Sequence, residues 1–170
     1  MSLTSERPSA LGLTWIFQEF WGFKNPPTIT DFEAYGKALL ICAGGDGDLA
    51  SAEREYAIGL IAGMHGPDEV VETLKTYGGE DDLRAVLSNA EGARESGGCL
   101  VYDTIRVSAA DGVLAPGELD KIHEVADLLS VPRENVAQMV RIHQQEQELR
   151  DQRFKLCFPD AANRPFAPVS

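Results

Sequence analysis

The most constraining feature of this chain of 170 residues is an internal repeat at an offset of 65 residues. Residues 46–53 read DGDLASAE and residues 111–118 read DGVLAPGE, so both follow the pattern D-G-x-L-A-x-x-E. The same ungapped alignment makes 8 of the 26 positions from 46 to 71 identical to their counterparts, more than chance readily gives. We therefore infer a duplicated helix–loop–helix unit in which each loop carries an Asp and a Glu seven residues apart.

Glycine and proline divide the chain into pieces of helical length, and no alternating β-branched run is long enough for a strand. Apolar residues recurring every three or four positions predict helices at 9–24, 31–43, 51–65, 67–78, 81–95, 99–110, 116–130 and from Pro132 onward. The predicted fold is a compact all-α bundle of about seven or eight helices in a single domain, residues 1–158. Its repeat units would be 31–78 and 98–142, packed about a pseudo-two-fold axis, and residues 159–170 would form an extended or mobile tail.

Composition narrows the possible partners and the compartment. The formal net charge is −12, which argues against nucleic acids and anionic membrane surfaces, because both are bound by clustered Lys and Arg. No apolar run approaches the roughly 20 residues of a membrane span, so we expect no membrane insertion. The three cysteines lack a C-x-x-C spacing and the N-terminus lacks a secretion signal, which favours a cytoplasmic protein with reduced thiols.

The loop carboxylates are the strongest functional lead. A hard divalent cation takes about six to eight oxygen ligands, and carboxylates and loop carbonyls supply them. Neither loop completes such a shell, but together they provide five carboxylates. The candidate metal ligands are Asp46, Asp48, Glu53, Asp111 and Glu118. The cation could be calcium, magnesium, manganese or zinc.

An ordinary EF-hand is excluded. The pattern matches the second half of an EF-hand loop, but the earlier ligand positions would fall on residues that are poor or impossible ligands. These residues are Cys42, Gly44, Val107 and Ala109.

A purely structural interpretation of the loops stays open beside the metal site. Asp-Gly is a turn signal, and a Glu at the third helical position can accept the backbone N–H of the N-cap residue. The inferred N-caps are Ala50 and Ala115, although alanine caps a helix about 0.5–2 kcal/mol less well than Ser, Thr, Asp or Asn. The same unfavourable choice in both repeats suggests a functional constraint on the loops.

The phrases Cys42-Ala43-Gly44-Gly45-Asp46-Gly47 and Ser108-Ala109-Ala110-Asp111-Gly112-Val113-Leu114, each followed by Glu and an apolar helix, resemble the TerB-like tellurite-resistance family. A related domain occurs in DjlA-type co-chaperones. The resemblance spans about residues 31–145. It implies an all-helical duplicated fold, a cytoplasmic place, a stress-response role and a possible divalent-metal site made of the five loop acids.

Three functions remain as hypotheses. The first is a non-enzymatic stress-response module that binds a divalent cation and a protein partner, such as another tellurite-resistance protein. The second is a metal-free helical adaptor or co-chaperone-type interaction domain. The third, a small carboxylate-dependent hydrolase, has the least support because no nucleophile–base arrangement can be identified.

Overall fold

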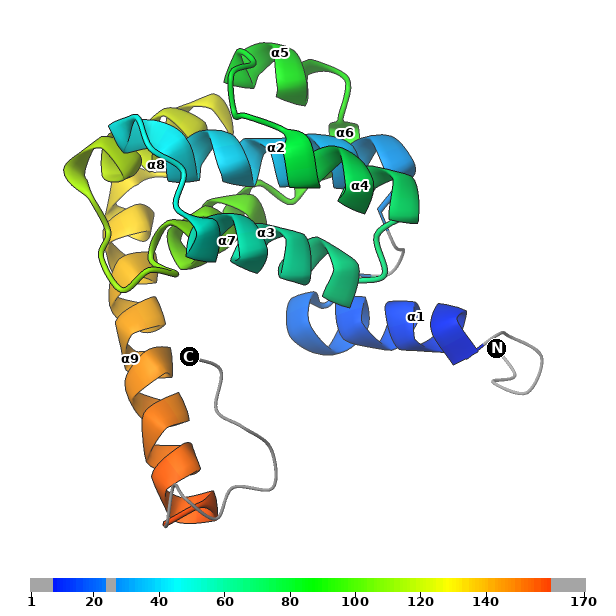
Figure 1. Ribbon diagram of the computed structural model, residues 1–170. Coiled ribbons are helices and arrows are strands. Elements are labelled where there is room, and N and C mark those ends of the chain that lie inside the picture. The colour runs from blue at the N-terminus through cyan, green and yellow to red at the C-terminus, as the bar shows by residue number, and fades with distance from the viewer. Residues whose placement is uncertain (1–7, 24–26, 160–170) are drawn as a thin grey trace.

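The computed structural model describes residues 8–23 and 27–159, and these residues form helices and turns without a strand (Figure 1). The predicted all-α fold is confirmed. The helices in this part of the chain are α1 (Pro8–Trp21), α2 (Ile29–Ala43), the 3-10 helix η1 (Gly44–Asp46), α3 (Ser51–Gly63), α4 (Asp68–Thr76), α5 (Leu83–Ser88), α6 (Glu91–Glu95), α7 (Gly97–Ser108), α8 (Pro116–Leu128) and α9 (Arg133–Cys157). The predicted tail lies, apart from Pro159, outside the described residues.

The prediction of one helix over 81–95 is wrong, because two short helices occupy this segment. Asp82 is the N-cap of α5 and accepts the backbone N–H of Ala85 at 2.9 Å. The helix stops at Asn89, and the guanidinium of Arg94 donates to the carbonyls of Leu87 and Ser88. These bonds satisfy the carbonyls that the end of α5 leaves without helical partners.

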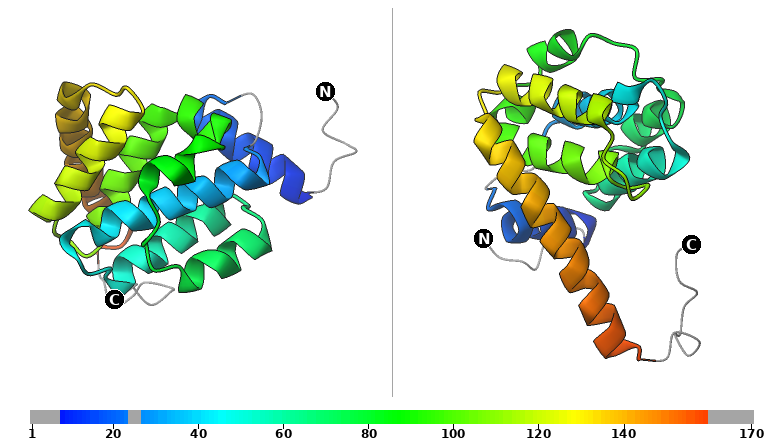
Figure 2. Two further views of the ribbon diagram at one scale, coloured as in Figure 1. Left: turned by 90° about the horizontal axis from the view of Figure 1, so that it is seen from above. Right: turned by 90° about the vertical axis from the view of Figure 1, so that its left-hand side faces the viewer.

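Helix α2 is the centre of the molecule. It packs against α3, α4, α5, α6, α7 and α8, which lie around it in both views of Figure 2. Leu39 and Leu40 are fully buried, although they point to different sides of the helix. A helix that is apolar on most sides belongs in a core. As the first helix of the first predicted repeat, α2 also packs against α7 and α8 of the second.

The two predicted repeats have the same order of elements, with α2, α3 and α4 in the first and α7, α8 and α9 in the second. Unusual backbone conformations recur at the same offset of 65 residues. Gly47 and Gly112 have φ of 100° and 98°, and His65 and Ser130 both have φ of 57°. Non-glycine residues rarely adopt positive φ, so this coincidence supports a common origin of the two units. Their superposition stays a prediction.

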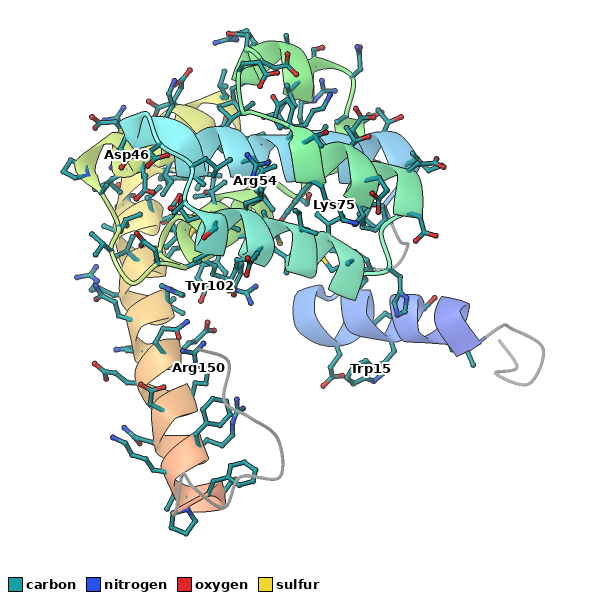
Figure 3. All side chains as sticks on the ribbon, in the orientation of Figure 1. Trp15, Asp46, Arg54, Lys75, Tyr102 and Arg150 are labelled. Atoms are coloured by element: carbon teal, nitrogen blue, oxygen red, sulfur yellow. The ribbon has the colours of Figure 1, made fainter. Side chains whose placement is uncertain are left out.

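The terminal helices differ in how they meet this body. On α1, Phe17 is buried and its ring packs on Phe23 and Phe32, with centroid distances of 6.1 Å to each. Trp15 on the same helix is 58% exposed and points away from the body (Figure 3). Helix α9 begins against α7 and α8, then runs away from them. No helix in the described part of the chain is both long and apolar enough to cross a membrane.

Candidate functional site

Both Asp-Gly loops are built in the same way. Asp46 Oδ1 accepts the backbone N–H of Asp48 at 3.1 Å, and Asp111 Oδ1 accepts that of Val113 at 2.8 Å. The glycine that follows each Asp has positive φ, which glycine adopts without strain. Each aspartate therefore closes its own turn, as the structural interpretation of the loops predicts.

The helix after each loop begins at an alanine N-cap, and a glutamate at the third helical position holds this helix start. The backbone N–H of Ala50 donates to Glu53 Oε2 at 2.9 Å, and that of Ala115 donates to Glu118 Oε2 at 2.6 Å. Alanine has no side-chain acceptor, so only the glutamate half of a capping box forms. Glu53 and Glu118 thus hold their helix starts in the way expected of the third helical position.

The two loops meet at a close glycine contact. A Cβ added to Gly45 would lie 2.7 Å from the carbonyl oxygen of Gly117, and one added to Gly117 would lie 2.8 Å from that of Gly45. Helix η1 packs on α8, and Asp46, labelled in Figure 3, is the last residue of η1. The backbones can approach this closely because neither glycine carries a side chain.

This contact brings two buried carboxyl groups together. Glu53 is 2% exposed and Glu118 is 3% exposed, and their side chains are within hydrogen-bonding distance of each other. Burial raises the pKa of Glu53 to about 8, with further raising contributions from Glu118 and Asp111 and an opposing one from the Ala50 N–H. We refer to these two residues as the glutamate pair.

When both are ionised, the two carboxylates of the glutamate pair cannot hydrogen-bond to each other. Glu53 Oε1 is buried and has no hydrogen-bond partner among the described residues. Two carboxylates are both acceptors, so their contact requires either a proton on one of them or a cation between them. The pair is therefore suited to hold a positive charge.

The five predicted ligands do not all converge. Glu53 and Glu118 meet, whereas Asp46, Asp48 and Asp111 lie on exposed loop positions and the first and last of these close turns. Within residues 8–23 and 27–159, no group of three or more His, Cys, Asp or Glu side chains is arranged to hold a metal ion. The donor set thus fits a cation only in part. Glu53 and Glu118 would supply two carboxylates, and loop oxygens or water would have to supply the remaining ligands.

A second buried carboxylate escaped the sequence analysis. Asp103 on α7 is fully buried, accepts the Tyr35 hydroxyl at 2.9 Å and forms an ion pair with Arg106 at 2.7 Å. Its position three residues after Leu100 and four before Val107 places it on the apolar face of α7, which is the signal that could have revealed it. Because the Tyr35 hydroxyl and the Arg106 guanidinium both bond to Asp103 within the fold, Asp103 has a structural role.

A buried histidine also escaped the sequence analysis. His143 on α9 is 7% exposed. Burial lowers its pKa, and the nearby Arg106 lowers it further. It follows from this environment that His143 is neutral and belongs to the packing of α9 on α7.

A solved structure decides the family. No protein-family model matches the chain, and no curated protein matches it either. A crystal structure described as a tellurite resistance protein from Nostoc punctiforme is 33% identical, covers 95% of this chain and 99% of that chain, and has a TM-score of 0.85. The chain belongs to the TerB-like tellurite-resistance family. The resemblance inferred from the two loops of this TerB-like protein is thereby confirmed.

Proposed function

We propose that this TerB-like protein is a non-enzymatic, tellurite-resistance-like module whose paired loops bind a divalent cation between Glu53 and Glu118. The contact of the glutamate pair, with a buried Glu53 oxygen that has no partner in the described part of the chain, is the observation that carries the proposal. The relationship to a protein described as a tellurite resistance protein supports the stress-response role. A protein partner, such as another tellurite-resistance protein, belongs to the same proposal.

Bound between the glutamates, a divalent cation would supply the positive charge that the pair otherwise obtains from a proton. Carboxylate oxygens are ligands of calcium, magnesium and manganese, and zinc also accepts them. The turn-forming Asp111 adds negative charge near Glu53, and Asp46 and Asp48 add more on the exposed surface of the first loop. Acidic surroundings of this kind raise the local concentration of cations.

A metal-free adaptor is the second candidate, and two observations favour it. The aspartates are accounted for by turns and the glutamates by helix starts, without any metal. In addition, the raised pKa of Glu53 allows one proton to join the pair near neutral pH. In this case the loops are the joint between the two repeats, and the function rests on a protein partner alone.

Thermal unfolding separates these two functions. The wild-type protein, stripped with EDTA, would be melted at pH 7.5 alone and with calcium, magnesium, manganese or zinc. One of these cations at a hundred times its Kd should stabilise the fold by about 2.7 kcal/mol. The variant with Glu53→Gln and Glu118→Gln should fold but lose this response, because an amide is a much weaker ligand than a carboxylate.

The matched control is Glu55→Gln, which removes an exposed carboxylate from the same helix as Glu53. It should respond to the cation as the wild type does. A wild-type protein whose melting temperature ignores all four cations would refute the metal site and leave the adaptor.

A further inference from the structure

The second half of α9 leaves the body of the molecule. Residues 144–159 are exposed except for the half-buried Gln147, although Phe154 and Phe158 are exposed only to 37% and 36%, whereas Val136 and His143 in the first half are buried. Figure 1 and the right-hand view of Figure 2 show this half projecting well beyond the other helices, and Figure 3 places Arg150 on it. We call residues 141–157 the α9 arm; its first turn, with Ile142 and the buried His143, still lies against the body.

An apolar stripe runs along the α9 arm. Ile142, Leu149 and Leu156 are 48%, 62% and 83% exposed. They are seven residues apart, which places them almost in line on a helix of 3.6 residues per turn. Single exposed leucines are ordinary, but a stripe at heptad spacing on a projecting helix is typical of packing against another helix.

The two halves of the α9 arm differ in charge. Glu146 and Glu148 precede Leu149, with Arg141 at the start of the arm, whereas Arg150, Arg153 and Lys155 follow Leu149 together with Asp151. Glu146 also accepts the hydroxyl of Tyr102 on α7. A second arm running in the opposite direction would place its basic half beside this acidic half, and the reverse. A parallel arm would place like charges together, which is unfavourable.

We propose that two copies of this chain pair through antiparallel α9 arms, with a two-fold axis at Leu149. In this arrangement Leu149 contacts Leu149 of the second copy, and Ile142 contacts Leu156 of the second copy. Such an interface is isologous, so one stripe and one charge pattern serve both chains. Apart from Arg141, which would face Cys157, the charge pattern complements its own reverse, with Glu148 facing Arg150 of the second copy. This complementarity argues for a second copy rather than an unrelated protein as the occupant.

The size of the α9 arm sets the expected strength. Sixteen steps of about 1.5 Å give a contact about 24 Å long, which is short for a permanent dimer. The pairing should therefore depend on protein concentration. It is independent of the cation proposed at the glutamate pair, which lies on other elements.

Sedimentation of the full chain over a concentration series tests the stripe. The wild type should pass from monomer to dimer as the concentration rises. Leu149→Glu should weaken the dimer more than about tenfold, because the substituted residue occurs twice at the centre of the interface. Gln144→Glu adds the same charge on a different side of the arm and should dimerise like the wild type.

Charge reversal tests whether the charges of the arm hold two copies together, whichever direction the arms take. One variant carries Arg150→Glu and Arg153→Glu, and the other carries Glu146→Lys and Glu148→Lys. Each should be monomeric alone, because both halves of its arm then repel the second copy, and an equal mixture should form a heterodimer. A wild type that stays monomeric up to about millimolar concentration, or a mixture that does not associate, would overturn the proposal.

A thiol placed by design gives an independent readout of direction. Cys157 is exposed, and Arg141→Cys would place a second thiol beside Cys157 of the other copy. Mild oxidation with diamide should convert these two thiols to a disulfide and cross-link this variant into dimers. A wild-type dimer cross-linked through Cys157 alone would indicate parallel arms and contradict the proposal.

Discussion

At the residue scale, Glu53 is the side chain that burial and charge constrain most. Its folded pKa of about 8 lies above the unfolded value near 4.5, so folding favours the protonated form. The stability that this proton contributes is full below pH 4.5 and is lost as the pH rises through 8. Without metal, the contribution of Glu53 to the free energy of unfolding should therefore be smaller at pH 8.5 than at pH 5.

Glu53→Gln should remove this pH dependence. The amide oxygen keeps the bond from the Ala50 N–H, and the amide nitrogen can donate to Glu118. Relative to the wild type, the variant should gain about 1–3 kcal/mol at pH 8.5, the usual cost of an unsatisfied buried polar group. Urea unfolding of both proteins at pH 5 and 8.5 in EDTA measures this difference. An equal pH dependence in both proteins would contradict the assignment.

The residue scale also shows what the sequence could reveal. The glutamates and their helix-start role follow from D-G-x-L-A-x-x-E alone, because the helical period fixes which residue reaches back to the cap. That Glu53 would touch Glu118 depended on the close approach at Gly45 and Gly117, which no local pattern encodes. Asp103 and His143 were missed because their burial is set by helices distant in the chain.

At the element scale, Asp31 links two helices that lie far apart in sequence. It occupies the third position of α2 and accepts the backbone N–H and hydroxyl of Thr28, at 3.1 and 2.6 Å. Its other oxygen accepts the backbone N–H of Ala93 in α6 at 3.1 Å. Burial opposes its ionisation, but these bonds outweigh that effect and lower its pKa.

Asp31→Asn should therefore destabilise the fold. An amide has one acceptor oxygen, so either the start of α2 or the N–H of α6 loses its partner, at about 1–3 kcal/mol. Since the pKa of Asp31 is lowered, this contribution is present above pH 4 and fades as the pH falls below it. Glu33→Gln, which breaks only the partly exposed ion pair with Lys37, should change stability by less than about 1 kcal/mol.

Denaturant unfolding at pH 7 and pH 3 compares these two variants. Equal stability of Asp31→Asn and the wild type at pH 7 would show that the Thr28 and Ala93 bonds do not hold α2 and α6 together.

The start of α2 shows how closely the sequence can predict a helix boundary. The helix was predicted to begin at residue 31, but Thr28 is its N-cap and Asp31 completes the capping box. Several polar residues in a row leave the starting residue of a helix ambiguous.

At the scale of the whole molecule, the junction of the two repeats rests on two residues without side chains. The reciprocal approach of Gly45 and Gly117 places the two loops in contact and lets the glutamate pair form beneath them. The duplication was predicted from the sequence, and the recurring backbone conformations support it. The way in which the two units meet was not, because it depends on a contact between backbones and not on a side-chain pattern.

Gly117→Ala should loosen this junction. Its Cβ would lie 2.8 Å from the carbonyl oxygen of Gly45 and 2.9 Å from the Cα of Asp46, so the loop backbones must move apart. We expect a loss of about 1–3 kcal/mol, as for other overpacked sites, even though alanine favours helices more than glycine does.

Gly59→Ala is the matched control, because this helical glycine has nothing within 4 Å of an added Cβ and should gain up to about 1 kcal/mol. Thermal melts would show the two substitutions acting in opposite directions. Because the separated loops also part the glutamate pair, Gly117→Ala should shift the pH dependence of stability toward that of Glu53→Gln. If both alanines stabilise the protein equally, the repeats do not depend on this contact.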